Sequence, residues 1–181
     1  MKYRNEITIK NGQKCIIRNG TFEDGPEVST FFTTTHGETD YLLSYPEEST
    51  RDDEKQSNYL KETTESDREI ELLAIVDGKV VGMAGFNAIG SKYKVRHRAE
   101  FGITVSKNYW GQGIGKAIMN ACIKCAKEAG YIQLELDVVA DNTRAIELYK
   151  KLGFIEFGRN PKGFQSKYSG FQELVYMRLE L

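Results

Sequence analysis

Seven segments of the chain have the apolar and β-branched composition of strands. The clearest spans residues 132–139, which are nearly continuous in apolar and branched side chains. Asp77-Gly78 is a two-residue hairpin turn, so the segments on either side of it should pair. The expected strands cover residues 14–18, 70–76, 79–89, 98–105, 132–139, 154–157 and 171–179.

Four segments have the patterns of helices. The longest runs from about Gly113 to Gly130, where apolar residues recur on one face and Gly130 suits a C-cap. Thr21 and Asp24 form a near capping box at the start of a helix that ends near Thr34. The other two helices run from a start signal at Thr50–Asp53 to about Thr64, and from a cap at Asp141 to about Gly153, with loops expected at 36–50, 91–96 and 162–170.

The order of these elements is βααβββαβαββ. Such an alternation predicts an α/β domain with a mixed sheet. No repeat, low-complexity tract or linker interrupts the chain, so residues 1–181 are expected to form a single domain.

A glycine-rich loop, YWGQGIGK at residues 109–116, joins the strand at 98–105 to the longest helix. Glycines let the backbone adopt φ > 0 and approach a ligand closely. The first N–H groups of a helix have no partner inside it, and the helix dipole adds positive charge there. The loop therefore predicts a phosphate site. Its G-x-G-x-G spacing is not the dinucleotide fingerprint, and Ala117 after Lys116 excludes a Walker A loop.

An x-G-x-G-x-G loop at the mouth of a helix resembles the pyrophosphate loop of the GNAT superfamily of acyl-CoA-dependent N-acetyltransferases. A second segment, NTRAIELYKKLGF at residues 142–154, is similar to that family's N-x-x-A-x-x-x-Y-x-x-x-G-F segment. The resemblance implies the GNAT fold, which has a central mixed, twisted sheet of about seven strands and about four flanking helices. Its fourth and fifth strands splay apart.

The same resemblance implies acetyl-CoA as the co-substrate. In the family, the pantetheine arm pairs like a strand with the end of the fourth strand, and Gly102 is consistent with a bulge there. The family usually has Arg or Gln where this chain has Trp110, which we expect to pack in the core rather than on the adenine. The residues implied in binding are Ile103, Thr104 and Val105 for pantetheine, and Gly111, Gln112, Gly113, Ile114, Gly115 and Lys116 for the pyrophosphate.

Asn142 and Tyr149 are seven residues apart, so both lie on one helix face about 10 Å from each other. By resemblance, Asn142 would contact the pantetheine and Tyr149 the sulfur. The alternatives are a first-turn or cap residue beside Asp141 for Asn142, and a core aromatic for Tyr149.

Acyl transfer to an amine needs a base, because a typical alkyl amine has a pKa of about 10. Tyr149 resembles the family's general acid. Glu100 is the first candidate base, since HRAEF at 97–101 resembles a stretch in bacterial spermidine N-acetyltransferases. Asp137 occupies the position of the base in ribosomal-protein alanine acetyltransferases, and His97 ranks third. Alternatively, each carboxylate is structural and paired with Arg96, Arg98 or Arg144.

Composition places the chain among ordinary soluble proteins. It has 40% hydrophobic residues and a formal net charge of −1, which argues against a generic nucleic-acid binder. No apolar run approaches the roughly 20 residues of a membrane span. No signal peptide is visible and only three cysteines occur, so a cytoplasmic location is expected. Cys122 and Cys125 lie in the apolar stripe of a predicted helix, so we expect core residues there and no metal site.

Charge is concentrated in one stretch. From Glu38 to Glu71 there are twelve acidic and four basic residues, a net of −8. This stretch is either a solvated helix or an acidic rim that attracts a cationic substrate. The resemblance of residues 97–101 to spermidine N-acetyltransferases favours a small cationic amine, such as a polyamine, as the acceptor, and the acidic stretch agrees with it. A protein N-terminus and a non-catalytic acyl-CoA-binding module are the alternatives. Family members often form dimers, so a homodimer is also expected.

Overall fold

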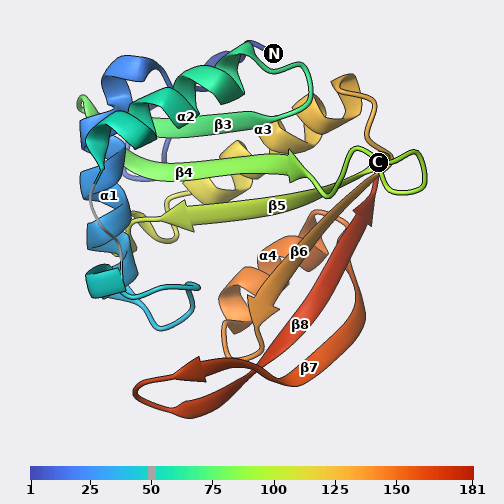
Figure 1. Ribbon diagram of the computed structural model, residues 1–181. Coiled ribbons are helices and arrows are strands. Elements are labelled where there is room, and N and C mark those ends of the chain that lie inside the picture. The colour runs from blue at the N-terminus through green and yellow to red at the C-terminus, as the bar shows by residue number, and fades with distance from the viewer. Residues whose placement is uncertain (49–51) are drawn as a thin grey trace.

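The computed structural model describes residues 1–48 and 52–181. Within them, eight strands form one mixed sheet in the order β1-β2-β3-β4-β5-β6-β8-β7 (Figure 1). Neighbouring strands are antiparallel except β5 and β6, which are parallel. The strands are β1 (Arg4–Thr8), β2 (Lys14–Asn19), β3 (Ile70–Val76), β4 (Lys79–Ala88), β5 (Arg98–Val105), β6 (Gln133–Val139), β7 (Ile155–Ser166) and β8 (Gly170–Glu180).

The sheet has one strand more than the seven expected. β1 pairs with β2 from Arg4↔Arg18 to Thr8↔Lys14. Four of its five residues are exposed and the fifth is half-buried. A strand at the sheet edge with so little buried surface has no apolar alternation, so its sequence carries no strand pattern.

The expected loop at 162–170 is wrong. β7 extends to Ser166, and Phe164, Gln165 and Ser166 pair with β8. The register shifts between Asn160 and Phe164, around Pro161, which suits a bulge in an edge strand. β7 is exposed or half-buried along its length except at Ser166, so it lacks the buried face that an apolar pattern would report.

The described chain has four α-helices, as expected: α1 (Gly25–Glu38), α2 (Asp53–Glu65), α3 (Ile114–Glu128) and α4 (Thr143–Lys151). The capping box of Thr21 and Asp24 is present, but it caps the N-terminus of the short 3₁₀ helix η1 (Phe22–Asp24). α1 follows η1 directly. Asp52 caps α2, since its side chain accepts a hydrogen bond from Lys55 N at 2.8 Å. Thr50 and Arg51 of the expected start signal lie outside the described residues. Two more 3₁₀ helices are η2 (Pro46–Glu48) and η3 (Lys107–Tyr109).

Helices cover both faces of the sheet (Figure 1). α1 and α2 pack on one face through a small core that includes Val28, Leu60 and Leu73. α3 and α4 pack on the other face through the main core, to which Ile118 and Tyr149 belong. None of the helices in the described ranges is long and apolar enough to cross a membrane.

β5 and β6 separate along their length. Their parallel pairing covers only Arg98–Glu100 with Gln133–Glu135. Beyond Glu135, β6 continues alongside β8 as far as Val139↔Leu174. The ribbon opens between the two strands toward their carboxyl ends (Figure 1). The splay expected between the fourth and fifth strands is therefore confirmed, with β5 and β6 as those strands in the observed numbering.

Candidate active site

The opening between β5 and β6 leaves one edge of β5 without a strand partner. The β5 residues beyond Glu100 pair with β4 on one side only. Ile103 and Val105 turn their side chains into the main core, which directs Gly102 and Thr104 to the α1–α2 face. The expected bulge at Gly102 is wrong, because the β4–β5 register is unbroken from Gly82↔Val105 to Ala88↔Ala99. The opening arises because β6 follows β8.

The glycine loop at the end of β5 has free N–H donors. Gly111 and Gly113 have φ values of 80° and 96°, and Gly113 is the N-cap of α3. In the described chain, no group accepts a hydrogen bond from the N–H of Gly113, Ile114 or Gly115. The Ile114 side chain is fully buried, so only its backbone can face a ligand. This arrangement suits a phosphate group.

Trp110 holds this loop against the end of β5. Its indole Nε1 donates a hydrogen bond to Val105 O at 2.6 Å, and the ring is half-buried. The loop is also tied to the β1–β2 turn, since Lys10 N donates to Gln112 O at 3.2 Å. Gln112 Oε1 is buried without a hydrogen-bond partner among the described residues. Trp110 is therefore a half-buried residue of the loop and not the core residue that was expected, and it adds a hydrogen bond that the sequence did not indicate.

Arg144 is a cation of this site that sequence reasoning considered only as an ion-pair partner. Its guanidinium lies 5.4 Å from the centre of the Trp110 ring. A Cβ built on Gly111 would lie 3.2 Å from Arg144 Nη2, so the side chain reaches over the glycine loop. Arg144 has no carboxylate partner in the part of the chain that the structure describes. With the exposed Lys116, it adds positive charge beside the free N–H groups.

α4 begins at Asn142 rather than at the expected cap, Asp141. The Asn142 side chain accepts a hydrogen bond from Ala145 N at 3.3 Å. Its cap role uses the carbonyl oxygen, which leaves the amide NH₂ free to donate. Asp141 was favoured because it is the first capping residue after β6. The Asn142 N–H instead donates to Val139 O in a tight turn, and this turn puts Asn142 at the cap position.

Tyr149 lies on the buried face of α4. Only 7% of its surface is exposed, and its ring packs 5.8 Å from that of Phe154. The hydroxyl has no hydrogen-bond partner in residues 1–48 and 52–181. Burial raises the pKa of Tyr149 well above its ordinary value. The side chain is therefore a neutral phenol at physiological pH, with a proton available to donate.

The two carboxylates named as candidate bases lie on the α1–α2 face of the sheet. Their neighbours Ala99, Phe101, Leu136 and Val138 belong to the main core, so alternation turns Glu100 and Asp137 to the opposite face. Asp137 is solvent-exposed, yet partial desolvation by its neighbours first, and then the charges of Glu100 and Glu135, raise its pKa. Neither Glu100 nor Asp137 has an ion pair in the described ranges, so the alternative of structural carboxylates paired with arginines is wrong.

Glu135, which sequence reasoning did not single out, takes the arginine instead. Arg98 donates to both of its carboxylate oxygens, with Nη2 at 2.7 Å from Oε2. This pairing lowers the pKa of Glu135. Arg96 lies over the Tyr93 ring at 4.5 Å instead. His97 precedes β5, and its carbonyl accepts from Ile132 N and Gln133 N at the closed end of the strand pair.

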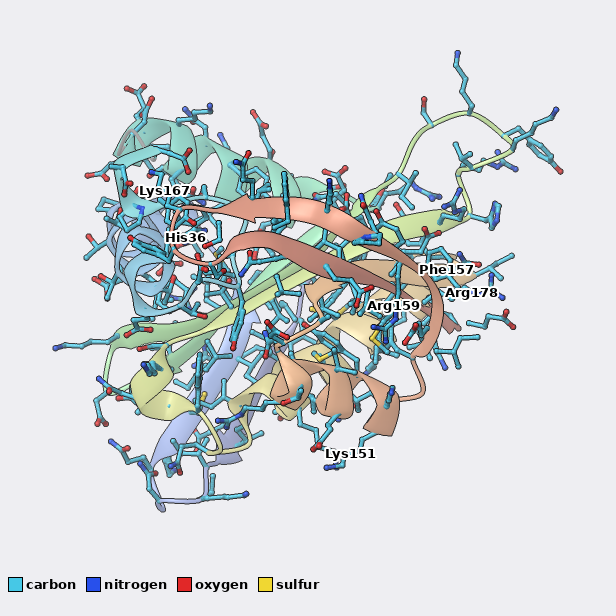
Figure 2. The ribbon with its side chains drawn as sticks, turned by 90° about the horizontal axis from the view of Figure 1, so that it is seen from below. His36, Lys151, Phe157, Arg159, Lys167 and Arg178 are labelled. Carbon is cyan, nitrogen blue, oxygen red and sulfur yellow. The ribbon has the colours of Figure 1, made fainter. Side chains whose placement is uncertain are left out.

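Residues of the acidic stretch line two open cavities on this face. One, of about 460 Å³, lies along α2 and is lined by Asp52, Glu54, Lys55, Asn58, Tyr59 and Glu62. The other, of about 320 Å³, lies between α1 and the β7–β8 hairpin, with His36 and Tyr168 among its lining residues. Figure 2 shows Lys167 at the hairpin tip and His36 on α1. Both cavities are lined mainly by residues between 36 and 62.

The hairpin is tied to this segment by Asp40. Its carboxylate accepts hydrogen bonds from Ser166 Oγ at 2.6 Å and Gln172 Nε2 at 3.2 Å. Its other oxygen accepts from the Tyr45 hydroxyl at 2.9 Å. Lys167 also pairs with Glu47. These contacts hold the β7–β8 hairpin along one side of the α1–α2 face.

The remaining motif is structural. Cys122 and Cys125 are 0% and 2% exposed in the core under α3, and both are free thiols. Burial raises the pKa of each thiol, so both stay protonated. The apolar alternation of β8 is likewise a matter of packing, because Val175 and Met177 are fully buried in the same core.

Fold and site together define an α/β protein with an anion-binding loop beside a splayed parallel strand pair. Comparison with known proteins places it further. Residues 35–154 match the Acetyltransferase (GNAT) family, and the chain belongs to this family. It is 32% identical over 108 residues to the L-amino acid N-acetyltransferase AaaT of Escherichia coli, a match that covers 59% of this chain and 65% of that relative. The chain thus spans less than two thirds of that relative's length.

Solved structures share nearly the whole fold. The acetyltransferase of the GNAT family from Streptococcus pneumoniae superposes with a TM-score of 0.88 at 27% identity, over 92% of this chain and 99% of that one. The ribosomal-protein-alanine N-acetyltransferase from Brucella melitensis gives 0.80 at 27% identity, over 91% and 99%. The fold inferred from the two sequence motifs is therefore confirmed.

Proposed function

We propose that this protein transfers the acetyl group of acetyl-CoA to a primary amine of a small cationic acceptor. The observation that carries the proposal is the presence of a proton donor and of candidate proton acceptors beside the splayed strands. A neutral phenol, Tyr149, approaches from the α4 side, and two unpaired carboxylates, Glu100 and Asp137, lie on the α1–α2 face. Membership of the GNAT family supports the same reaction class.

The chain offers donors suited to each part of acetyl-CoA. The free N–H groups of Gly113, Ile114 and Gly115 would bind the pyrophosphate, with Arg144 and Lys116 beside them. The unpartnered edge of β5 at Ile103, Thr104 and Val105 would pair with the pantetheine amides, and the Asn142 amide would donate to the same arm. These contacts would bring the thioester to the opening between the strands.

Asp137 is the base that the electrostatics favour. A base works best when its pKa lies near the working pH, and the pKa of Asp137 is raised whereas that of Glu135 is lowered. In the proposed reaction the acceptor ammonium gives its proton to Asp137, and the amine nitrogen attacks the thioester carbonyl. The C–S bond breaks, Tyr149 donates its proton to the departing thiolate, and the amine nitrogen loses its second proton to water, from which Tyr149 is reprotonated. Glu100 would hold the acceptor's positive charge near Asp137.

A cationic acceptor is favoured by the charges that remain unpaired on this face. Glu100 and Asp137 are free of ion pairs in the described chain, whereas Arg98 is engaged by Glu135. The cavity along α2 adds three carboxylates and one lysine. A positive amine would therefore be drawn to the face where the base lies.

A second candidate acceptor is an L-amino acid, the class named for the relative AaaT. It would need a cation for its α-carboxylate. Arg178 is the residue that favours this option, because its Nε is buried without a hydrogen-bond partner among the described residues. Arg178 lies near Phe157 on the hairpin side of the face (Figure 2). A protein N-terminus is a third option, which the similarity to the Brucella enzyme supports.

The test is thiol release from acetyl-CoA across a panel of polyamines, monoamines, amino acids and N-terminal peptides. Release that is fastest with polyamines is the expected result. Release only with amino acids would shift the acceptor site toward Arg178, and release only with peptides would support the protein acceptor. Tight acetyl-CoA binding without release for any acceptor would overturn the catalytic proposal in favour of a non-catalytic acyl-CoA-binding module.

A further inference from the structure

A buried carboxylate, Glu71 of β3, lies on the α1–α2 face outside the set of groups used above. Only 7% of its surface is exposed. Its Oε2 atom accepts a hydrogen bond from the Tyr59 hydroxyl at 3.2 Å, and its Oε1 atom has no partner in the described chain. No lysine, arginine or histidine pairs with it there. A buried carboxylate is costly unless a cation or several donors compensate it, and among the described residues Glu71 has one donor and no cation.

The carboxyl group of Glu71 leans over β4 toward β5. A Cβ built on Gly85 of β4 would lie 2.7 Å from Glu71 Oε2, so the absence of a side chain at Gly85 makes room for the carboxylate. Gly85 pairs across the sheet with Gly102 of β5. A Cβ on Gly102 would meet nothing within 4 Å. Two paired glycines therefore leave a bare strip of sheet between the carboxylate and the open edge of β5.

Tyr59 connects this carboxylate to the acidic cavity along α2. The residue lines that cavity, and its hydroxyl reaches Glu71. Its hydroxyl also interacts with Asn87 of β4, which pairs across the sheet with Glu100. Glu71, Tyr59 and Asn87 thus form a continuous polar row that leads to Glu100. The row begins at the buried carboxylate and ends at the group proposed to hold the acceptor.

The charged and titratable groups around Glu71 contribute no positive charge. Tyr59 belongs to α2 and donates to Glu71. Cys122 belongs to α3 on the other face of the sheet, and the charge of Glu71 adds to burial in raising the pKa of its thiol. Burial raises the pKas of both groups, which keeps them neutral. Burial also raises the pKa of Glu71 to about 7, so the carboxylate is partly ionised at physiological pH. An ammonium group beside it would supply the missing charge and favour the ionised form.

We propose that Glu71 and Tyr59 form a second amine subsite, which binds the far ammonium group of a linear diamine acceptor while its near amine lies at Glu100 and Asp137. This inference rests on the proposed function and narrows its acceptor to diamines. Adjacent strands are about 4.8 Å apart, and two residues along a strand span about 6.8 Å. The Glu71 carboxylate lies over Gly85 of β4, so one strand spacing to β5 and two residues along β5 to Glu100 give on the order of 8 Å. A linker of roughly three to five methylenes spans a similar length, since a C–C bond is about 1.5 Å.

The test compares 1,4-diaminobutane with n-butylamine, which lacks only the second amine. In the wild-type protein, KM for the diamine should be roughly tenfold or more below that for the monoamine. Glu71→Gln keeps the size of the side chain and removes its charge. We expect it to raise KM for the diamine by roughly tenfold or more, in the range seen when one partner of a buried charge pair is removed, and to leave butylamine kinetics unchanged. Tyr59→Phe should weaken the diamine preference less.

Glu65→Gln is the matched control, because it removes one negative charge near the end of α2 without lining the cavity. It should leave the diamine preference intact. Equal changes for the diamine and the monoamine in Glu71→Gln would overturn the proposal, since a structural role would affect both. A wild-type protein that turns over both amines equally would overturn it as well.

Calorimetric titration of 1,4-diaminobutane into the CoA-bound protein separates this inference from the proposed reaction. Binding that weakens tenfold or more in Glu71→Gln, or by a smaller but measurable factor in Tyr59→Phe if the first variant does not fold, supports the subsite even if no amine is acetylated. Equal affinity in wild type and variant overturns the subsite even if acetyl transfer is fully active.

Discussion

The two sides of the splayed strands are built in different ways. On the acetyl-CoA side, the proposed contacts come from one continuous segment, Ile103–Lys116, together with Arg144 and Tyr149 of α4 and its N-cap, Asn142. Most of them are backbone N–H groups of a strand edge and a helix start. On the acceptor side, the carboxylates Glu71, Glu100 and Asp137 come from β3, β5 and β6, and Tyr59 comes from α2. These groups are side chains that only the sheet brings together.

This difference separates what each side tolerates. A site made of backbone groups depends on local conformation, so it survives changes of side chain but not changes of φ. A site made of dispersed carboxylates depends on charge balance, so a single neutral substitution changes the pKa or the partner of another group. Variants on the two sides should therefore fail in different measurements.

The largest effect is expected where both sides meet, at Tyr149. Tyr149→Phe removes the phenol that would protonate the thiolate, so kcat should fall by roughly 10²- to 10⁴-fold while acetyl-CoA still binds. Stopped-assay turnover and calorimetric acetyl-CoA affinity measure the two quantities. Tyr131→Phe is the control, because Tyr131 is equally buried but its hydroxyl donates to Arg68 O away from the site. Unchanged turnover in Tyr149→Phe would remove Tyr149 from the mechanism.

A smaller effect is expected from the backbone of the acetyl-CoA side. Gly113 and Gly130 lie at the two ends of α3, both at positive φ and both with no atom within 4 Å of an added Cβ. Alanine at either position should lower the free energy of unfolding by about 1–2 kcal/mol, because a residue with a Cβ is strained in the left-handed conformation. Only Gly113→Ala should also raise KM for acetyl-CoA, by roughly tenfold, because it would move the loop N–H groups that are proposed to bind the pyrophosphate. Equal KM values in the two variants would contradict the role of this loop.

The smallest effect concerns the charges of the acceptor side. Glu100 is negative and raises the pKa of Asp137, so Glu100→Gln should lower that pKa. If Asp137 acts as the base in its ionised form, kcat/KM rises as pH increases through its pKa. The acid limb of the pH profile should therefore move to lower pH in Glu100→Gln. Loss of turnover at every pH would instead identify Glu100 as the base.

Much of the fold could be predicted because its interior strands and its long helix have regular patterns. The six interior strands and the helix 114–128 were expected within a few residues of their observed bounds. The misses lie where burial is low. β1 is almost wholly exposed, and the outer half of β7 continues as an edge strand beyond the core. Such strands are held by backbone pairing, which leaves no mark on the apolar pattern.

The candidate site divides in the same way. The glycine loop, Asn142 and Tyr149 could be named from the sequence because their spacing along one chain segment fixes their geometry. Glu100 and Asp137 could be named as carboxylates, but not their freedom from arginines, because Glu135 on the same face takes Arg98. Glu71 gave no signal at all, since an acid inside a β-branched strand has no motif.

By itself, the sequence determined the family and named the glycine loop and Tyr149 as candidate site residues, because each of these depends on residues close together in the chain. Only the tertiary structure decided which carboxylates have no ion pair among the described residues, and that Glu71 is the buried one. It also placed the paired glycines, Gly85 and Gly102, between Glu71 and the open edge of β5. Electrostatic interactions act through space over a few ångströms, and the sheet sets those distances by joining strands that are up to 66 residues apart, as Glu71 and Asp137 are.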